Sequence, residues 1–344
     1  MLAASGCGGA SRTWSGDDAA PIDDTPDMAV APLPDGATPR DMAGAKPVDM
    51  AMTTGPADMA PTPITGSVGP KGGTVSRLYF GFSGDARPSQ CNETFDYPTT
   101  ILNSIYTRMN GLGLQFSVDL GDHMFVCQNG TQAMATGQMN LFMSAAAKFA
   151  NKPTFLTLGN HDCVSMTNPS YCKVGGFTTP NFTAFLNALA PVSSQPYYSF
   201  DVQTQSGLAR FVVIADNAWS SAQQTWLTQT LADADAKAKY IFLFRHHPLD
   251  NTDMPDFQTI SGIIKTVKHR TMTFTGHTHE FKLDTFNDAS GRTVVIGNGG
   301  APLTQNFTWY GFGTVEQLQN GNLAIRLIDQ ATGNQMGAFT ISPQ

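Results

Sequence analysis

Residues 153–162 have the sequence PTFLTLGNHD, a short apolar, strand-like run that ends in glycine and is followed by three polar residues. Asn160, His161 and Asp162 place a carbonyl oxygen, an imidazole and a carboxylate within one turn. In an α/β protein such a turn at the end of a strand borders the ligand-binding crevice. This stretch therefore predicts a site rather than a piece of core.

Four further strand-like runs end in the same way. They are residues 78–83, 114–120, 240–244 and 271–275, which lead into Asp85, into Asp122 and His123, into His246 and His247, and into His277 and His279. The strand ends of an α/β sheet converge, so we expect these side chains to meet. Six of the seven histidines lie at four of these five strand ends, which favours a metal or catalytic centre.

The periodicity of the rest of the chain indicates the fold class. Helices are expected over residues 99–109, 132–150, 181–190 and 221–236, with strands at 196–201 and 209–215. After His279 we expect only short strands, at residues 281–286, 293–296, 308–315, 323–328 and 335–341. Two sheets packed face to face, with helices outside, would bury both halves. We therefore predict an α/β fold for residues 67–344.

The first 66 residues have a different character. They contain nine of the 27 acidic residues, few bulky apolar side chains, and four copies of Asp-Met-Ala. Such a segment cannot offset its ordering entropy, so we expect residues 1–66 to be a signal remnant followed by a disordered tether. Residues 2–7, LAASGC, resemble the end of a bacterial lipoprotein signal. We expect an exported protein, periplasmic or on the cell surface, attached to the membrane by a lipid on Cys7.

The other four cysteines could be metal ligands or disulfides. None has the Cys-x-x-Cys spacing of a zinc cage. We favour two disulfides, Cys91–Cys127 and Cys163–Cys172, which also indicate an oxidising compartment.

The charge of the chain excludes some partners. The net charge is −7, but most of the excess lies in residues 1–66, and the remainder is nearly neutral with no basic run. Binding to a nucleic-acid backbone needs a basic patch, so no nucleic acid is expected as partner. No apolar stretch approaches the roughly 18 residues of a membrane-spanning helix. We expect a monomer.

Five motifs in this order resemble those of the calcineurin-like metallophosphoesterases, a family that includes purple acid phosphatases. They are Asp85-Ala86-Arg87, Gly121-Asp122, Gly159–Asp162, His246-His247-Pro248 and Gly276–His279. The resemblance covers roughly residues 75–300. It implies a four-layer α/β/β/α sandwich with two mixed sheets, and a metal-dependent phosphoric ester hydrolase with a phosphate ester as substrate.

The resemblance also implies a centre of two divalent or trivalent ions, Fe, Zn or Mn. Asp122 would bridge them, Asp85 and His279 would bind the first, and Asn160, His246 and His277 the second. A metal-bound hydroxide would attack a phosphomonoester or phosphodiester. His161 would hydrogen-bond the phosphoryl oxygen or protonate the leaving alkoxide, with Asp162 orienting its ring.

One position departs from the family pattern. Arg87 stands where the common motif has a histidine ligand, and a guanidinium cannot coordinate a metal. Purple acid phosphatases compensate with a tyrosine three residues after the bridging aspartate, but here that residue is Phe125. Either His123 is the replacement ligand while Arg87 clamps the substrate phosphate, or the first site is weak. We favour the former.

The alternative function is a phosphate- or ligand-binding surface lipoprotein that retains the fold but is a weak catalyst because of Arg87.

Overall fold

The computed structural model describes residues 63–127, 129–163, 179–248, 256–268, 271–284, 293–304 and 307–343. Their fold is mixed α/β, as predicted. The helices among them are α1 (Thr99–Gly111), α2 (Gln132–Ala146), α3 (Pro180–Leu189), α4 (Ser221–Lys237) and α5 (Phe257–Lys265). None of these helices is both long and apolar enough to cross a membrane.

The strands of the described residues form two sheets, both mixed. The first, in spatial order, consists of β1 (Gly66–Gly69), β2 (Gly72–Val75), β6 (Tyr198–Thr204), β7 (Gly207–Val213), β8 (Tyr240–Phe244), β9 (Met272–Thr275), β11 (Thr293–Ile296) and β10 (Phe281–Asp284). The second consists of β14 (Gln335–Ile341), β13 (Leu323–Asp329), β12 (Gly311–Gln317), β3 (Tyr79–Ser83), β4 (Ser117–Asp119) and β5 (Thr154–Leu156).

Aromatic side chains fill the space between the two sheets. Phe80 of β3 packs edge-on against Phe211 of β7 and Phe242 of β8, with ring centroids 5.3 Å apart in both pairs. These edge-to-face contacts are the arrangement that aromatic rings prefer. The central core thus holds the sheets together and sets the spacing of their strand ends.

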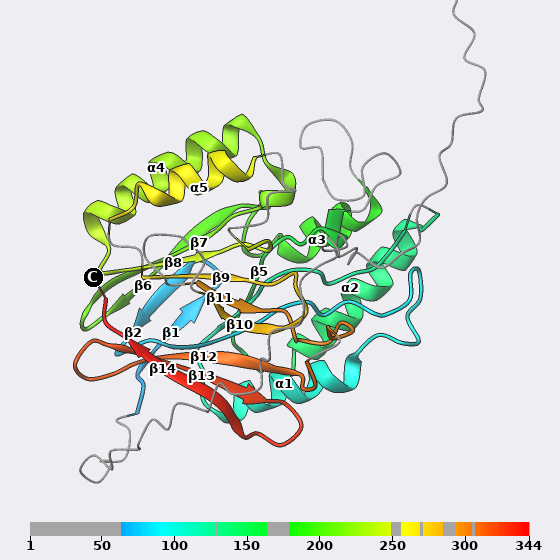
Figure 1. Cartoon of the computed structure of the whole chain (residues 1–344), viewed down its shortest axis with the longest axis horizontal. Helices are drawn as coiled ribbons and strands as arrows, with labels where there is room; N and C mark the ends of the chain where they lie inside the picture. Colours follow the sequence, from blue (N-terminus) through cyan, green and yellow to red (C-terminus); the bar gives the residue numbers. More distant parts are fainter. Residues whose placement is uncertain are drawn as a thin grey trace, which may run out of the picture. The chain divides into compact units, whose positions relative to one another are not determined.

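The opposite face of the first sheet is covered by α4 and α5 (Figure 1). Alternate residues of β7 and β8, such as Val212 and Ile241, contact Leu227 of α4 and Ile260 of α5 in a second apolar cluster. Because side chains alternate along a strand, β7 and β8 are buried on both faces. This explains why both strands are nearly continuous apolar runs in the sequence.

The topology brings the predicted site loops to one edge. In the second sheet β3, β4 and β5 run parallel, and in the first sheet β7, β8 and β9 run parallel. The loops that carry Asp85, Asp122 and Asn160 follow β3, β4 and β5, whereas those that carry His246 and His277 follow β8 and β9. The site is therefore built from both sheets.

Several elements differ from the sequence-based expectation. The α5 helix and the β1–β2 hairpin were not expected, and α2 ends at Ala146 instead of residue 150. The strand predicted over residues 308–315 runs from Gly311 to Gln317, since its register is set by pairing with β3. Residues 285 and 286, Cys7 and most of the predicted tether lie outside the described residues.

Hydroxyl side chains explain where three of the helices begin. Thr131, Thr179 and Ser220 accept hydrogen bonds from the backbone N–H groups of Met134, Phe182 and Gln223, at the start of α2, α3 and α4. Such N-caps satisfy donors that have no partner inside the helix.

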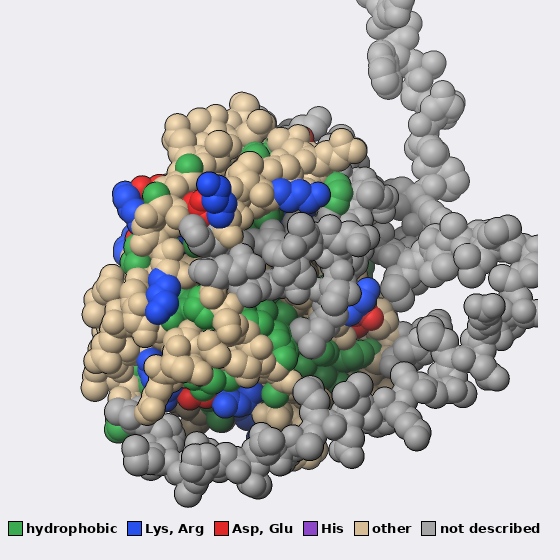
Figure 2. All heavy atoms as spheres, turned by 60° about the vertical axis from the view of Figure 1, so that its left-hand side comes forward, with side chains coloured by type: hydrophobic (Ala, Val, Ile, Leu, Met, Phe, Trp, Pro, Cys, Tyr) green, Lys and Arg blue, Asp and Glu red, His purple; other side chains and the backbone are tan. Residues whose placement is uncertain are grey.

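Basic side chains on the surface are partly paired with acidic ones. Figure 2 shows Lys and Arg spread over the visible face, some of them beside Asp or Glu. Arg210 bonds to Asp201 at 2.7 Å and also to Asp233, and Arg77 bonds to Glu316 at 2.7 Å. The arginine side chains of these pairs are largely shielded from solvent.

Candidate metal centre

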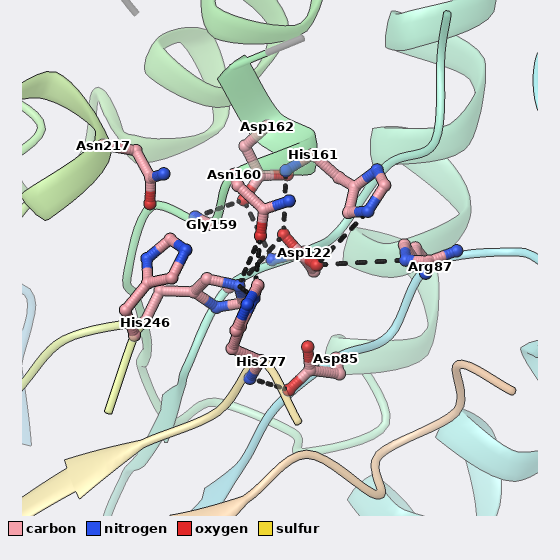
Figure 3. Close-up of polar contacts among 12 residues, drawn as sticks. Asp85, Arg87, Asp122, Gly159, Asn160, His161, Asp162, Asn217, His246 and His277 are labelled. Carbon is pink, nitrogen blue, oxygen red and sulfur yellow. Dashed lines mark hydrogen bonds and ion pairs between the residues drawn. The ribbon is translucent and has the colours of Figure 1, made fainter. Parts of the chain in front are cut away.

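Donor atoms from three loops converge on one point near the strand ends (Figure 3). The Oδ1 atom of Asn160 lies 2.9 Å from Nε2 of His246 and 3.1 Å from Nδ1 of His277. The two imidazole nitrogens are 3.3 Å apart. Ligands about 2.0–2.2 Å from a shared ion lie roughly 3.0–3.5 Å from one another at tetrahedral or octahedral angles. This spacing fits one cation.

A second group of donors shares Asp122 with the first. Oδ1 of Asp122 is 3.4 Å from Nε2 of His246. Ligand atoms of Asp85, Asp122 and His279 all lie within 4.8 Å of one another. The two donor groups together are the six side chains that the family resemblance implied as metal ligands, with Asp122 common to both.

Backbone carbonyls orient two of the imidazoles. Nδ1 of His246 lies 2.8 Å from the carbonyl oxygen of Leu120, and Nδ1 of His279 lies 2.7 Å from that of Pro302. A carbonyl can only accept, so each Nδ1 carries the proton. Nε2 of both rings therefore faces the carboxylates, as in histidines that bind a metal through one nitrogen while the other donates to a carbonyl.

The charges of the centre call for a cation. Asp85 and Asp122 are both buried, and Oδ1 of Asp85 accepts no hydrogen bond from the described residues. Burial raises the pKa of Asp85 to about 8. Although burial opposes it, the carboxylate of Asp122 raises the pKa of His246 to about 10. Positive charge at Nε2 of His246, either a proton or a metal ion, is thus stabilised, and the donor set fits metal ions.

The backbone at four of these donor residues is strained. Asp85, Asp122, His277 and His279 have φ values of 62°, 58°, 75° and 50°. The left-handed region costs a residue with a side chain about 1–2 kcal/mol. Such strain gathers at functional sites, where the surrounding fold enforces it.

Glycines allow the loops to approach. A Cβ on Gly159 would lie 2.2 Å from Oδ1 of Asp122, and one on Gly276 would lie 2.5 Å from Oδ2 of Asp85. Neither position has room for a side chain. The glycines that precede Asn160 and His277 are therefore needed for close packing against the two carboxylates.

Asp162 has a different role from the one expected. We predicted that it orients the ring of His161, but its buried carboxylate accepts hydrogen bonds from the backbone N–H groups of Asp122, His123 and Gly159, at 3.1, 2.9 and 2.9 Å. It also lies 3.0 Å from Nδ1 of His123. Asp162 thus joins the loops that follow β4 and β5, which is a structural contribution to the site.

The geometry argues against His123 as the replacement ligand. Its Nδ1 lies 3.0 Å from Asp162 and its Nε2 lies 3.1 Å from Asp119, so carboxylates occupy both nitrogens. The ring packs against Phe142, with centroids 4.5 Å apart. Burial disfavours its charge, but Asp162 and Asp119 raise the pKa of His123 to about 10. His123 is therefore a buried cation between two carboxylates, neither of which belongs to the donor groups.

Arg87 and His161 lie at the side of the centre. Nε of Arg87 and Nε2 of His161 are each 3.9 Å from Oδ2 of Asp122 (Figure 3). Burial and the positive charge of Arg87 lower the pKa of His161 to about 3. Both predicted catalytic side chains are thus brought to the carboxylate shared by the two donor groups.

A buried ion pair supports the loop that carries His246. Asp216, after β7, accepts hydrogen bonds from Nε of Arg245 at 3.1 Å and from the backbone N–H of His247 at 3.0 Å. All three residues are buried. Despite burial, His247 and Arg245 hold the pKa of Asp216 well below its usual range. Asp216 thus fixes the position of the loop that carries His246.

The predicted disulfide Cys91–Cys127 is present, with a Cα–Cα distance of 5.8 Å. Cys163 is also a disulfide cysteine, but its predicted partner Cys172 lies outside the described residues.

Two supporting residues were missed from the sequence. Asp119 is buried inside an apolar strand, and Gln138 is buried on the inner face of α2. Oε1 of Gln138 accepts a hydrogen bond from the backbone of Phe125 at 2.6 Å. The signal was available: a polar residue at a core position must find a partner.

Comparisons with known proteins bear on the family and the fold of the chain. A model of the calcineurin-like phosphoesterase family matches residues 91–281. A purple acid phosphatase from yellow lupin (Lupinus luteus) seeds has a similar structure, with TM-score 0.57 and 16% identity over 78% of this chain and 54% of that chain. A dimetal phosphatase from Danio rerio has TM-score 0.56 and 14% identity over 78% and 99%. A search of curated proteins found no match.

At such identities the structures show a shared fold. The chain spans about half the length of the lupin enzyme, so whatever that whole protein does is not transferred to this chain.

The geometry of His123 leads to a first prediction. His123→Ala would leave the carboxylates of Asp119 and Asp162 without their shared cation. Removing one partner of a buried pair costs about 3–5 kcal/mol, so we expect a loss of this size in the free energy of unfolding, measured in urea. Metal content, measured by elemental mass spectrometry on the folded variant, should stay at the wild-type value. A loss of one metal equivalent per chain would instead support the original ligand assignment.

A second prediction concerns the approach of the loops. Gly159→Ala places a methyl group 2.2 Å from both N and Oδ1 of Asp122, so the two loops must separate and metal content should fall. In the matched control, Gly262→Ala, the new methyl meets no atom within 4 Å on exposed α5. That change should leave metal content unaltered and stabilise the helix by up to about 1 kcal/mol. Equal metal content in both variants would contradict this account of Gly159.

Proposed function

The chain belongs to the calcineurin-like phosphoesterase family, and on this premise we propose that it hydrolyses phosphate esters at the centre around Asp122. The observation that carries the proposal is that two groups of donor atoms share one carboxylate. Asn160, His246 and His277 form one group, with His246 next to Asp122, and Asp85 and His279 form the other group together with Asp122. Ions bound by the two groups would supply an acidic water and neutralise phosphate charge.

The residues around the centre suggest how the substrate is held. Arg87 offers a planar fork of N–H donors, which suits the oxygens of a phosphoryl group. We propose that Arg87 binds an unesterified oxygen of the substrate. Because Arg87 cannot coordinate a metal and His123 points elsewhere, Asp85, Asp122 and His279 are left as the protein donors of the first site.

His161 is proposed to donate from Nε2, the nitrogen that faces Asp122. Its Nδ1 atom is buried and makes no hydrogen bond within the described residues. The backbone of His161 is held from both ends: its N–H donates to Oδ1 of Asp122 at 2.9 Å, and its carbonyl accepts from Asn181 at 2.7 Å. Nε2–H can thus bond to the phosphoryl oxygen or to the leaving oxygen. Proton donation from a positioned group contributes typically about 10²–10⁴-fold.

The identity of the ions is proposed as Fe, Zn or Mn. Imidazole, amide oxygen and carboxylate donors are compatible with all three. Export is also part of the proposal. The disulfide Cys91–Cys127 supports it, because structural disulfides persist in oxidising compartments, whereas the proposed lipid attachment at Cys7 lies outside the described residues.

The function is tested by turnover of p-nitrophenyl phosphate and bis-p-nitrophenyl phosphate by the full chain. We expect wild-type protein to bind about two metal ions per chain and to hydrolyse at least one of the esters. Asp122→Asn removes the shared negative charge, so metal content should fall and turnover should drop to background. His161→Ala should keep its metal content and lose about 10²–10⁴-fold in kcat.

The results separate the enzyme from the alternative function. A wild-type protein that binds metal and inorganic phosphate but turns over neither ester would support a phosphate-binding protein. Full activity in His161→Ala would remove His161 from the proposed mechanism.

A further inference from the structure

Phe125 lies between the two side chains proposed to contact the substrate. The guanidinium of Arg87 lies over its ring, 4.7 Å from the centroid. The imidazole of His161 meets the same ring edge-to-face, with centroids 4.7 Å apart and an interplanar angle of 83°. A cation over an aromatic face is attracted by the ring quadrupole. Phe125 therefore packs against both polar groups.

The guanidinium is charged, largely buried and poorly satisfied. The Arg87 side chain is 13% exposed. Nε makes no hydrogen bond to any described residue, and Nη1 has a long contact of 3.4 Å with the carbonyl of Pro88. Its distance from Asp122, 3.9 Å, is too great for a hydrogen bond. Buried donors without partners are costly, so this arrangement is suited to an anion that completes it.

The backbone segment of Phe125 and the segment that follows Arg87 are held together. The N–H of Phe125 donates to Gln138 at 2.6 Å, and its carbonyl accepts from the N–H of Asn92 at 2.9 Å. Gln138 also donates to the carbonyl of Glu93 at 2.6 Å. The disulfide Cys91–Cys127 joins the same two segments. The segment after Arg87 and the segment of Phe125 are thus one cross-linked unit, so the guanidinium is presented from a fixed support.

We propose that Arg87, positioned by Phe125, makes the centre selective for phosphomonoester dianions over phosphodiesters. This inference rests on the proposed function. A monoester has three unesterified oxygens and two negative charges near neutral pH, whereas a diester has two such oxygens and one charge. Arg87 and His161 converge beside one oxygen of Asp122, at the side of the donor groups. Two unesterified oxygens of a substrate would face the donor groups, and Arg87 and His161 would bind a third.

A diester has no third unesterified oxygen, so its second ester substituent would lie beside Arg87 and His161 instead. The guanidinium donors would then stay unpaired, and sites built to hydrogen-bond a group discriminate strongly against ligands that lack it. Phe125 is consequently a positioning residue that acts through Arg87, and Arg87 determines the class of ester.

The test compares wild type, Arg87→Gln and Phe125→Leu in the full metal-loaded chain. Binding of inorganic phosphate and of dimethyl phosphate is measured by calorimetry, and kcat/KM is measured for p-nitrophenyl phosphate and bis-p-nitrophenyl phosphate. Phe95→Leu is the matched control, because it makes the same change in the same segment as Arg87 at a side chain that is 78% exposed. Metal content is measured for every variant.

In Arg87→Gln we expect phosphate affinity to fall by roughly 10–100-fold, the effect of losing a charged hydrogen bond, while dimethyl phosphate affinity changes less than about threefold. The ratio of monoesterase to diesterase kcat/KM should fall by a similar factor. Phe125→Leu should give a smaller loss of about 3–10-fold in the same direction, with unchanged metal content, and Phe95→Leu should match wild type.

Equal losses for both anions in Arg87→Gln, or an unchanged ester ratio, would overturn the selectivity. A Phe125→Leu variant with wild-type phosphate affinity would overturn the positioning role. If wild type turns over neither ester, the proposed function fails, and the anion affinities still decide whether Arg87 recognises a dianion.

Discussion

The hydrogen bonds of the Asp162 carboxylate are the contacts on which the geometry of the centre depends. The carboxylate accepts from the backbone N–H groups of Asp122, His123 and Gly159, and so joins the loops after β4 and β5. Both oxygens of Asp162 are used in this way inside the protein, where charged hydrogen bonds are strong. The shared carboxylate of Asp122 can stand beside Asn160 because these bonds hold the loops together.

The second constraint is the burial of several carboxylates in a small volume. Asp85, Asp119, Asp122 and Asp162 are all buried, and buried charges need partners. The positive charge of His123 partly neutralises the carboxylates of Asp119 and Asp162. Asp85 and Asp122 face the imidazoles of His246 and His279. The fold therefore separates a carboxylate pair that has a counter-charge of its own, His123, from a pair that a bound cation would neutralise.

This separation is visible at His123, the residue next to Asp122, whose two ring nitrogens lie beside Asp119 and Asp162. Asp122 has a left-handed backbone, with φ of 58°, and the chain turns so that His123 points towards Phe142 and Phe185. Arg87, at the position where the common motif has a histidine, lies over the ring of Phe125. Compared with the common motif, a neutral imidazole is replaced by the permanent positive charge of Arg87, 3.9 Å from the carboxylate of Asp122.

The sequence by itself determined the α/β class, the five strand ends and the side chains that gather there. It could do so because strand periodicity, turn glycines and the chemistry of Asp, Asn and His are local properties. It also placed the disulfide Cys91–Cys127 correctly. By contrast, the N-terminal hairpin, α5 and the register of β12 beside β3 depend on partners distant in the chain.

Only the tertiary structure decided which polar residues face the centre. His123 and Asp162 lie within the motifs that predicted ligands and catalysts, but their directions follow from backbone dihedrals and from the carboxylates they meet. Phe125, Gln138 and Asn92 contain no metal-binding pattern, and their roles arise from contacts between segments. The reason is physical: residue type is local, whereas the direction of a buried side chain is set by the packing and charges of every element around it.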